Sequence, residues 1–197
     1  GYTSIVRGLS GLLGIELTNN FRTPYFSRNF NEFWTRWHVS LSNWLRDYIF
    51  FPLSRSLLKK FPDRSHPVHI ILPPMLTMFL SGMWHGLSWN MLVWGGLHGV
   101  YLVVERLLSL HSRKAPDELP KWRQALSALV VFACVLLAWI PFRMHLGAAA
   151  QYLTGLVSPA NWQLWDFRFA LTQFLGGATT DQWMPWLFPF LQGLVFL

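Results

Sequence analysis

Two pairs of tryptophan and histidine stand out in this sequence because of the apolar residues around them. Trp37 and His38 lie in "FWTRWHVSLSNWLRDYIFFPL", and Trp84 and His85 lie in "SGMWHGLSWN". An imidazole gains and loses its proton near neutral pH, so it can serve as a general base or as a metal ligand. The two pairs therefore indicate proton-transfer chemistry in a largely apolar setting.

The three histidines inside apolar segments each have a structural interpretation beside the chemical one. Gly82 and Gly86 leave room at His85 for a ligand or for a neighbouring backbone, so both roles stay open there. Both stay open for His38 as well, because histidines flanked by aromatic residues often simply pack. For His98, in "WGGLHGVY", the glycines favour tight helix packing and a hydrogen-bonded imidazole over catalysis.

Other kinds of site fit the sequence less well. His66 and His69 have no Cys, Asp or Glu at ligand spacing, so we expect no metal. Haem ligation by paired histidines is a second possibility, but Pro-rich segments fit it poorly. The sequence has no G-x-S-x-G motif for a serine nucleophile. Histidines without a nucleophile suit a reaction in which the acceptor supplies its own hydroxyl and a neutral imidazole takes the proton.

The composition indicates a membrane protein. Of the 197 residues, 52% are hydrophobic and 13% are charged, whereas an ordinary soluble domain has about 25% charged residues. The 12 tryptophans fit a chain that meets the boundary between lipid and water. The net charge of +7 comes from basic residues in loops between apolar runs, as in cytoplasmic loops of membrane proteins. We therefore expect no nucleic-acid partner.

The first Trp-His pair lies in a segment, residues 31–50, whose pattern predicts one amphipathic helix. At about 100° per residue, its apolar side chains share an arc of roughly 160°, and its polar side chains take the other side. His38 falls on the apolar arc, about 200° from Arg36. A histidine needed only for solubility would lie with Arg36 instead, so the position favours a contact with protein or membrane.

Three uncharged runs, residues 68–84, 89–104 and 124–142, predict the membrane-spanning part. Each is near the roughly 20 residues that a spanning helix needs, and the third is the clearest. The first two form either two helices joined at "HGLS" or broken helices that line a cavity. Basic loops are expected over 54–66 and 105–123, and the topology of the hairpin between them stays open.

The remaining segments complete the predicted order. A Gly-interrupted helix is expected over residues 2–17, and "AAAQYLTGLV" predicts a short amphipathic helix. Residues 158–181 are Trp-rich and irregular, and 183–197 look like the start of another apolar helix. The chain opens with Gly1 and stops inside that apolar run, so we expect a fragment of a longer membrane protein.

The segments "FWTRWHVSLSNWLRDYIFFPL" and "LTMFLSGMWHGLSWNMLVWGGLHGVYLVVER" resemble the two signature blocks of the membrane-bound O-acyltransferase family. The resemblance is to the bacterial branch that contains alginate O-acetyltransferases and teichoic-acid D-alanyl transfer proteins. It implies that residues 1–157 are the C-terminal part of the acyltransferase domain, followed by 158–197 as a Trp-rich segment and a truncated apolar helix. The implied fold is an all-α, multi-pass transmembrane helical bundle with amphipathic and broken or re-entrant helices.

The resemblance also implies an activity. An acyl group, for which we favour acetyl, moves from a thioester donor such as acetyl-CoA to a hydroxyl of an extracytoplasmic polysaccharide such as alginate, and no cofactor is tightly bound. The implied location is the bacterial inner membrane, in several passes. The implied partners are the lipid bilayer, the polysaccharide acceptor, the acyl thioester donor and a periplasmic acetyltransferase.

Residue roles carry over from the matched blocks. His85 takes the "WHG" position and is implied as the catalytic base, and His38 takes the "RWH" position as the second catalytic histidine. The blocks also give four tentative substrate-binding residues: Trp37, Trp84, Arg46 and Asp47. The alternative for the charged pair is a structural role or a polar tunnel wall, and the alternative for Trp84 is packing beside the histidine.

Two other classes of function stay open at this stage. One is a transporter-like protein whose broken helices line a pathway and whose histidines relay protons. The other is a non-catalytic membrane scaffold that recruits an extracytoplasmic acyl-handling partner. Within the acyltransferase interpretation, the acyl group could be acetyl, D-alanyl or a longer chain.

Overall fold

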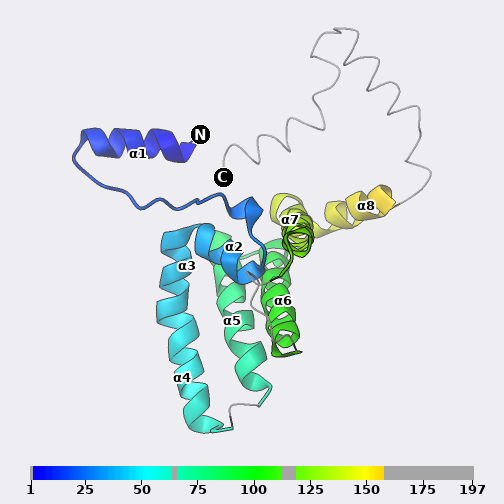
Figure 1. The fold of residues 1–197 in the computed structure, drawn as a ribbon. Helices are drawn as coiled ribbons and strands as arrows, with labels where there is room; N and C mark the ends of the chain where they lie inside the picture. Colours follow the sequence, from blue (N-terminus) through cyan, green and yellow to red (C-terminus); the bar gives the residue numbers. More distant parts are fainter. Residues whose placement is uncertain (1, 64–65, 112–118, 158–197) are drawn as a thin grey trace. The chain divides into compact units, whose positions relative to one another are not determined.

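The computed structural model describes residues 2–63, 66–111 and 119–157, and over these residues the chain forms helices and no strands (Figure 1). The predicted all-α class is confirmed for them. Residues 18–149 make one compact unit, which contains both Trp-His pairs, and the described residues 2–17 and 150–157 belong to a second unit. The Trp-rich segment and apolar start predicted over 158–197 lie outside the described residues.

The elements follow one another along the chain with short connections. The first half contains α1 (Tyr2–Leu12), the 3-10 turn η1 (Pro24–Phe26), α2 (Phe30–Arg36), α3 (Val39–Leu45), the π-helical turn η2 (Arg46–Phe50) and α4 (Phe51–Lys60). The second half contains α5 (Val68–His85), α6 (Trp89–His111), α7 (Lys121–Arg143) and α8 (Leu146–Val157). In the compact unit, α3 and α4 run one after the other along α5, and α6 lies on the other side of α5 (Figure 1).

The first helix ends earlier than predicted. It stops at Leu12 instead of residue 17, because Gly14 takes a left-handed conformation with φ of 72°. The N–H of Ile15 then donates to the carbonyl of Ser10 at 2.9 Å. This is the common glycine-based end of a helix, which satisfies carbonyls that have no partner in the last turn.

The single amphipathic helix predicted over residues 31–50 is wrong. The chain leaves the helix at Trp37, with φ of −98° and ψ of 127°, and turns at His38, with φ of 41° and ψ of 56°. The apolar arc is therefore split between α2 and α3, so Trp37 is buried while Trp44 is half exposed. A helical wheel treats the segment as isolated, whereas the break is held by hydrogen bonds from another part of the chain.

The two predicted basic loops are shorter than expected. Helix α4 continues to Lys60, and α6 continues to His111. Leu, Lys and Arg are good helix formers, so a basic stretch without proline can extend a helix. The positive charges of Lys59 and Lys60 also fall in the last turn of α4, where they interact favourably with the helix dipole.

The uncharged runs form two helices joined at the "HGLS" turn, which is the first of the two predicted alternatives. Helix α5 passes through Pro73 and Pro74 without a break. Each proline removes one backbone hydrogen bond of the helix. Both rings are buried, and the hydroxyl of Thr77 donates to the carbonyl of Pro73 at 2.7 Å. Packing against neighbouring helices therefore compensates for the missing bonds.

Helices α5 and α6 approach each other so closely that their backbones touch. A Cβ atom on Gly82 would collide with the carbonyl oxygen of Met91, and one on Gly95 would collide with the carbonyl oxygen of Met78. Small residues that let two helix backbones meet are typical of helix pairs in membranes. The contact fixes the end of α5, and therefore His85, against α6.

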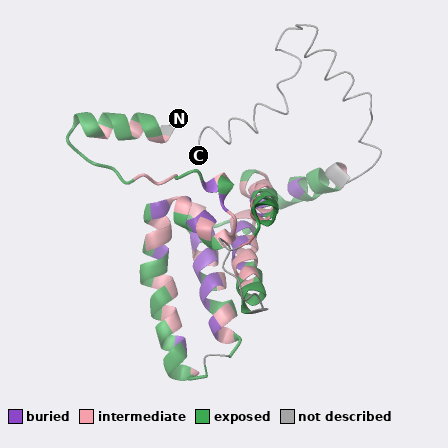
Figure 2. Ribbon diagram, viewed as in Figure 1, coloured by how far each residue is buried: buried purple, intermediate pink, exposed green. Residues whose placement is uncertain are grey.

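Helices α6 and α7 are long and apolar enough to cross a membrane, over Trp89–Leu110 and Lys121–Arg143. A helix of 23 residues is about 34 Å long, close to the roughly 30 Å of a bilayer core. Only 22% of each apolar window is buried, and α7 exposes apolar side chains along its length (Figure 2). A core helix of a soluble protein would be mostly buried, so the two helices fit membrane spans by length and composition.

An aromatic core connects the helices that carry the histidines. Its buried members come from α2, α5, α6, α7 and the break after α2: Phe33, Trp34, Trp37, Met78, Trp94, Val131, Val135 and Ala138. Aromatic rings of this size bury a large apolar area each and pack edge to face or offset. Figure 2 shows the buried positions concentrated where these helices face one another. Both Trp-His pairs pack against this core.

The backbone contact between α5 and α6 makes a prediction for adjacent glycines. Gly95→Ala should lower the free energy of unfolding by about 1–3 kcal/mol, because the new methyl group meets a rigid carbonyl. Gly96→Ala is the matched control, since its Cβ would meet only the Phe79 ring at 3.5 Å. Thermal unfolding of the detergent-solubilised protein measures both, and equal losses would contradict the backbone contact.

Candidate active site

His85 is the last residue of α5, and it lies among aromatic rings from three helices. Its ring centroid is 4.9 Å from that of Trp84, 5.1 Å from that of Trp94 on α6 and 5.0 Å from that of Phe142 on α7. The helix ends here because Gly86 takes an extended backbone conformation. The imidazole is half-buried, so the rings hold it in place while part of it stays accessible.

His38 lies in the break between α2 and α3, and it meets the same tryptophan. The centroids of the His38 and Trp84 rings are 5.8 Å apart. The Nδ1 atom of His38 is buried and has no hydrogen-bond partner among the described residues. The structure therefore brings the two predicted catalytic histidines to one indole, although one comes from the break after α2 and the other from the end of α5.

The helix before the break is fixed by Glu32. The side chain of Asn29 accepts the N–H of Glu32 at 2.7 Å, and the Glu32 carboxylate accepts the N–H of Arg28 at 2.7 Å, which caps the start of α2. The guanidinium of Arg36 lies 2.5 Å from the same carboxylate. Burial by itself raises the pKa of Glu32, but the bonds from Arg28 and the charge of Arg36 outweigh it and lower the pKa.

Glu105 attaches α2 to α6, and sequence reasoning missed it. Its carboxylate accepts the backbone N–H groups of Phe30 and Asn31 and the side-chain amide of Asn31. A negative charge is favourable at a helix N-terminus, where N–H groups have no partner within the helix. The signal was present in "LVVERLL", since an acidic residue at the edge of an apolar run usually has a partner.

Both candidate histidines lie outside the two candidate membrane spans, and burial lowers the pKa of each below the ordinary 6.5. For His38 this effect outweighs the influence of its own nearby backbone, which acts in the opposite direction. For His85 the positive charge of His38 lowers the pKa further. The two imidazoles are therefore neutral at neutral pH, which is the form that accepts a proton.

An open groove of about 710 Å³ reaches this site. His38 and Trp84 line it, together with mostly apolar side chains of α3 and α5 such as Leu41 and Leu80. Trp84 is 60% exposed although it is large and aromatic. His85 does not line the groove itself, but it contacts Trp84, which does. A substrate in the groove would therefore meet His38 and the indole first.

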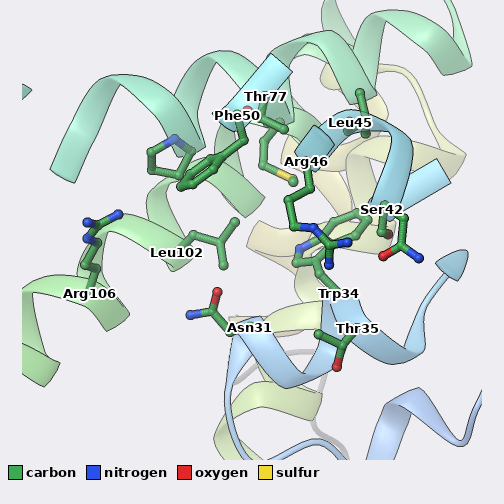
Figure 3. A pocket seen from close by; sticks show the side chains of 13 residues that line it. Asn31, Trp34, Thr35, Ser42, Leu45, Arg46, Phe50, Thr77, Leu102 and Arg106 are labelled. Atoms are coloured by element: carbon green, nitrogen blue, oxygen red, sulfur yellow. The ribbon is translucent and has the colours of Figure 1, made fainter. Parts of the chain in front are cut away.

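A second, smaller pocket of about 190 Å³ lies between α2, α3, α5 and α6 (Figure 3). Arg46 and Trp34 line it, and Figure 3 shows the guanidinium of Arg46 directed toward the Trp34 ring. Leu45 lines both this pocket and the groove. Arg46 also pairs with Asp47 at 3.2 Å, and both side chains are about half exposed. Asp47 lines neither pocket, and the substrate-binding roles of the two residues stay predictions.

Trp37 lies in the aromatic core. It is 5% exposed and stacks on Phe33, with 5.6 Å between ring centroids. It also contacts Trp139 at 5.3 Å and Phe21 at 4.9 Å. The structure thus places Trp37 away from the groove, where its rings support the turn at His38, and its contact with substrate stays a prediction.

His98 lies on the buried face of α6, inside a cage of aromatic rings. The cage consists of Phe33, Trp34, Trp94 and Tyr101, with ring centroids 4.9–6.0 Å from that of His98. Its side chain is 2% exposed. The sequence predicted a hydrogen-bonded imidazole, and no such bond is made by Nδ1, which has no partner among the described residues. The cage itself supplies the packing role.

Among the described residues, no group of three His, Cys, Asp or Glu side chains could hold a metal. The pair that the sequence singled out, His66 and His69, has ring centroids 6.3 Å apart. Nε2 of His69 is already bonded to the carbonyl of Phe61 at 2.9 Å. The Nδ1 atom of His66 accepts the N–H of Val68 at 3.2 Å. Both rings therefore serve the connection between α4 and α5.

Comparison with known proteins gives a consistent picture. Residues 4–147 match the family model of the membrane-bound O-acyltransferase family. The chain is 34% identical over 180 residues to a probable alginate O-acetylase, AlgI, of Azotobacter vinelandii, covering 91% of this chain and 34% of that protein. It is 35% identical over 177 residues to a peptidoglycan O-acetyltransferase of Helicobacter pylori, covering 89% and 32%. It is 33% identical over 154 residues to a teichoic acid D-alanyltransferase of Streptococcus thermophilus, covering 72% and 37%.

The chain thus spans about a third of the length of these curated relatives. The matched residues include both Trp-His pairs and every helix from α2 to α7. The resemblance predicted from the two sequence blocks is confirmed.

The aromatic cage makes a prediction for His98. His98→Ala should lower the free energy of unfolding by about 3 kcal/mol, because it leaves a cavity among four rings. His98→Phe keeps a flat ring and removes the buried nitrogen that has no partner, so its stability should stay within about 1 kcal/mol of the original. Chemical denaturation monitored by fluorescence compares them, and an equally large loss in both variants would show that the imidazole nitrogens are needed.

Proposed function

Because this chain belongs to the membrane-bound O-acyltransferase family, we propose that it moves an acetyl group from an acyl thioester, such as acetyl-CoA, to a hydroxyl of an extracytoplasmic polysaccharide such as alginate. One observation carries the proposal. Two half-buried imidazoles with lowered pKa values meet at Trp84, beside an open groove. A neutral base beside a space for substrate is what transfer to a hydroxyl needs.

The reaction assigns a role to each histidine. The ring of His85 accepts the proton of the acceptor hydroxyl while its oxygen attacks the thioester carbonyl. A C–O bond forms, the C–S bond breaks, and the leaving thiolate takes the proton back from the imidazolium. His38 lines the groove and, with Nδ1 buried, offers its other nitrogen to the acyl carbonyl or to the acceptor. This arrangement needs no tightly bound cofactor.

The surroundings suit this chemistry. Trp84 contacts both imidazoles, and the groove beside it is mostly apolar, so charges that develop there are poorly screened. Arg46 and Asp47 follow the groove-lining helix α3 and supply polar contacts for the hydroxyl-rich acceptor in this proposal. Trp84 supplies a flat, exposed apolar surface against which a sugar ring can pack, and Trp37 supports the turn at His38 from the core.

Names of the relatives guide the choice of acceptor and location. Alginate and peptidoglycan O-acetylation support a polysaccharide acceptor, whereas the D-alanyltransferases support transfer of a different acyl group to teichoic acid. We favour the acetyl group, since alginate O-acetylases are matched over 91% of the chain. The same proposal places the chain in the bacterial inner membrane as a multi-pass protein, with a periplasmic acetyltransferase as its partner.

The role of His85 predicts a large loss of activity on substitution. His85→Ala should lower acetyl transfer by about 100-fold or more, because a general base contributes 10²–10⁴-fold. The measurement is transfer of labelled acetyl from the thioester to polysaccharide in membranes that contain the intact protein. His66→Ala is the matched control, because His66 lies near the opposite end of the 18-residue helix α5. An unchanged acetyl content with His85→Ala would refute the proposal.

The lowered pKa values predict the acid limb of the pH profile. Activity depends on neutral imidazoles, so it should persist below pH 6.5 and fall only as the pH passes through the lowered pKa. Any residual activity of His38→Gln should fall at a higher pH than that of the original, because this variant removes the charge that lowers the pKa of His85. The shift should be modest, since burial is the larger cause. An acid limb above pH 6.5 in the original protein would contradict the assignment.

A further inference from the structure

The backbone of His38 has an unusual conformation for its residue type. With φ of 41° and ψ of 56° it is left-handed, and within the described residues only Thr23 shares this feature among non-glycine residues. Such a conformation costs an L-residue roughly 1–2 kcal/mol. It persists only where the surrounding structure holds it, and such sites are concentrated at functional residues.

The turn at His38 is held partly by its own helix. The N–H of Ser42 donates to the carbonyl of His38 at 2.9 Å, and the hydroxyl of Ser42 donates to the carbonyl of Trp37 at 2.8 Å. These bonds join neighbours in sequence. The first is an ordinary bond of the first helical turn, and the second reaches back across His38 to Trp37, so Ser42 holds the turn from the α3 side only.

Asn20 supplies the bonds that come from a distant segment. Its backbone carbonyl accepts the N–H of Val39 at 3.1 Å, and its side-chain Oδ1 accepts the N–H of Ser40 at 2.8 Å. These are the first two N–H groups of α3, which have no partner inside the helix. One residue therefore binds both residues that follow His38.

The same loop also binds the other side of the turn. The N–H of Arg22 donates to the carbonyl of Arg36 at 2.9 Å, at the end of α2. Asn20 and Arg22 thus hold the end of one helix and the start of the next, with Trp37 and His38 between them. Through this turn the His38 ring reaches Trp84 on α5, with 5.8 Å between the centroids.

We propose that Asn20 is the positioning residue of His38: by accepting the N–H groups of Val39 and Ser40, it fixes the left-handed turn that directs the imidazole toward Trp84 and the groove. The inference rests on the proposed function, in which His38 acts on substrate. Asn20 does not line the groove, so its effect on the reaction passes through the histidine.

The chemistry of the amide sets what each substitution does. Asn20→Ala removes Oδ1 and leaves the N–H of Ser40 without this acceptor, while the backbone bond to Val39 can persist. Asn20→Asp keeps an oxygen at the same place, so it can still accept. Asn19 is the matched control, because it is the same residue type one position away and is only partly buried.

The experiment measures acetyl transfer by Asn20→Ala, Asn20→Asp, Asn19→Ala, His38→Gln and the double variant Asn20→Ala with His38→Gln. We expect Asn20→Ala to lower kcat by about 10- to 100-fold with little change in KM, since misplacing a reacting group by about 1 Å can cost 10²-fold. Asn20→Asp should recover most of the rate, and Asn19→Ala should match the original. The double variant should be no slower than His38→Gln alone.

Different outcomes separate this proposal from the proposed function. If Asn20→Ala slows the His38→Gln protein by the same factor as the original, Asn20 acts on the fold in general and the positioning role is overturned. Original activity in Asn20→Ala overturns it as well, while losses in His85→Ala and His38→Gln leave the proposed function standing. Original activity in both histidine variants overturns the proposed function and the positioning role together.

Discussion

The close contact between the backbones of α5 and α6 determines where the chemistry can take place. Gly82 on α5 and Gly95 on α6 have no side chain to keep the helices apart. Each glycine therefore lies against a backbone carbonyl of the other helix. Helix α5 then ends against α6, and its last residue, His85, packs on the Trp94 ring. Larger residues would separate the helices and move the imidazole out of its aromatic walls. In lipid, where no hydrophobic force drives two apolar helices together, close packing of this kind is a main source of association.

A second constraint brings His38 to the same place. The Glu105 carboxylate on α6 holds the start of α2, and Asn20 holds the start of α3, so the break between the two helices is fixed at both ends. Charged and polar groups thus fix the ends of α2 and α3, while aromatic rings fill the space between the helices. The division is physically sensible, because ring packing tolerates small shifts whereas a charge-assisted hydrogen bond at a helix end fixes a position and a direction.

The sequence predicted the parts of this molecule that depend on local pattern. The apolar runs gave α5 and α7, and the Trp-His blocks gave both histidines and the family. The break at His38 could not be predicted, because its hydrogen bonds come from Asn20, a polar residue in a loop with no pattern of its own. The helical wheel therefore predicted one helix where the chain forms α2 and α3. The wheel also put Trp37 and Trp44 on one face, and their different burial was missed for the same reason, since the face that a residue presents depends on where its helix ends.

Three departures from local preference lie together at the candidate site. His38 has a left-handed backbone and a buried Nδ1 with no partner among the described residues, and Trp84 exposes a large aromatic surface beside it. Each of these features lowers the stability of the fold. A sequence chosen for stability alone would have a glycine at the left-handed turn and a smaller residue in place of the exposed indole. Nδ1 of His98 also lacks a partner within the described part of the chain, but His98 is 2% exposed and enclosed by aromatic rings, whereas backbone strain and an exposed ring meet at the groove beside His38. Because features that disfavour folding are expected to persist where a function requires them, their convergence on His38 and Trp84 supports chemistry at this end of α5 and a packing role for His98.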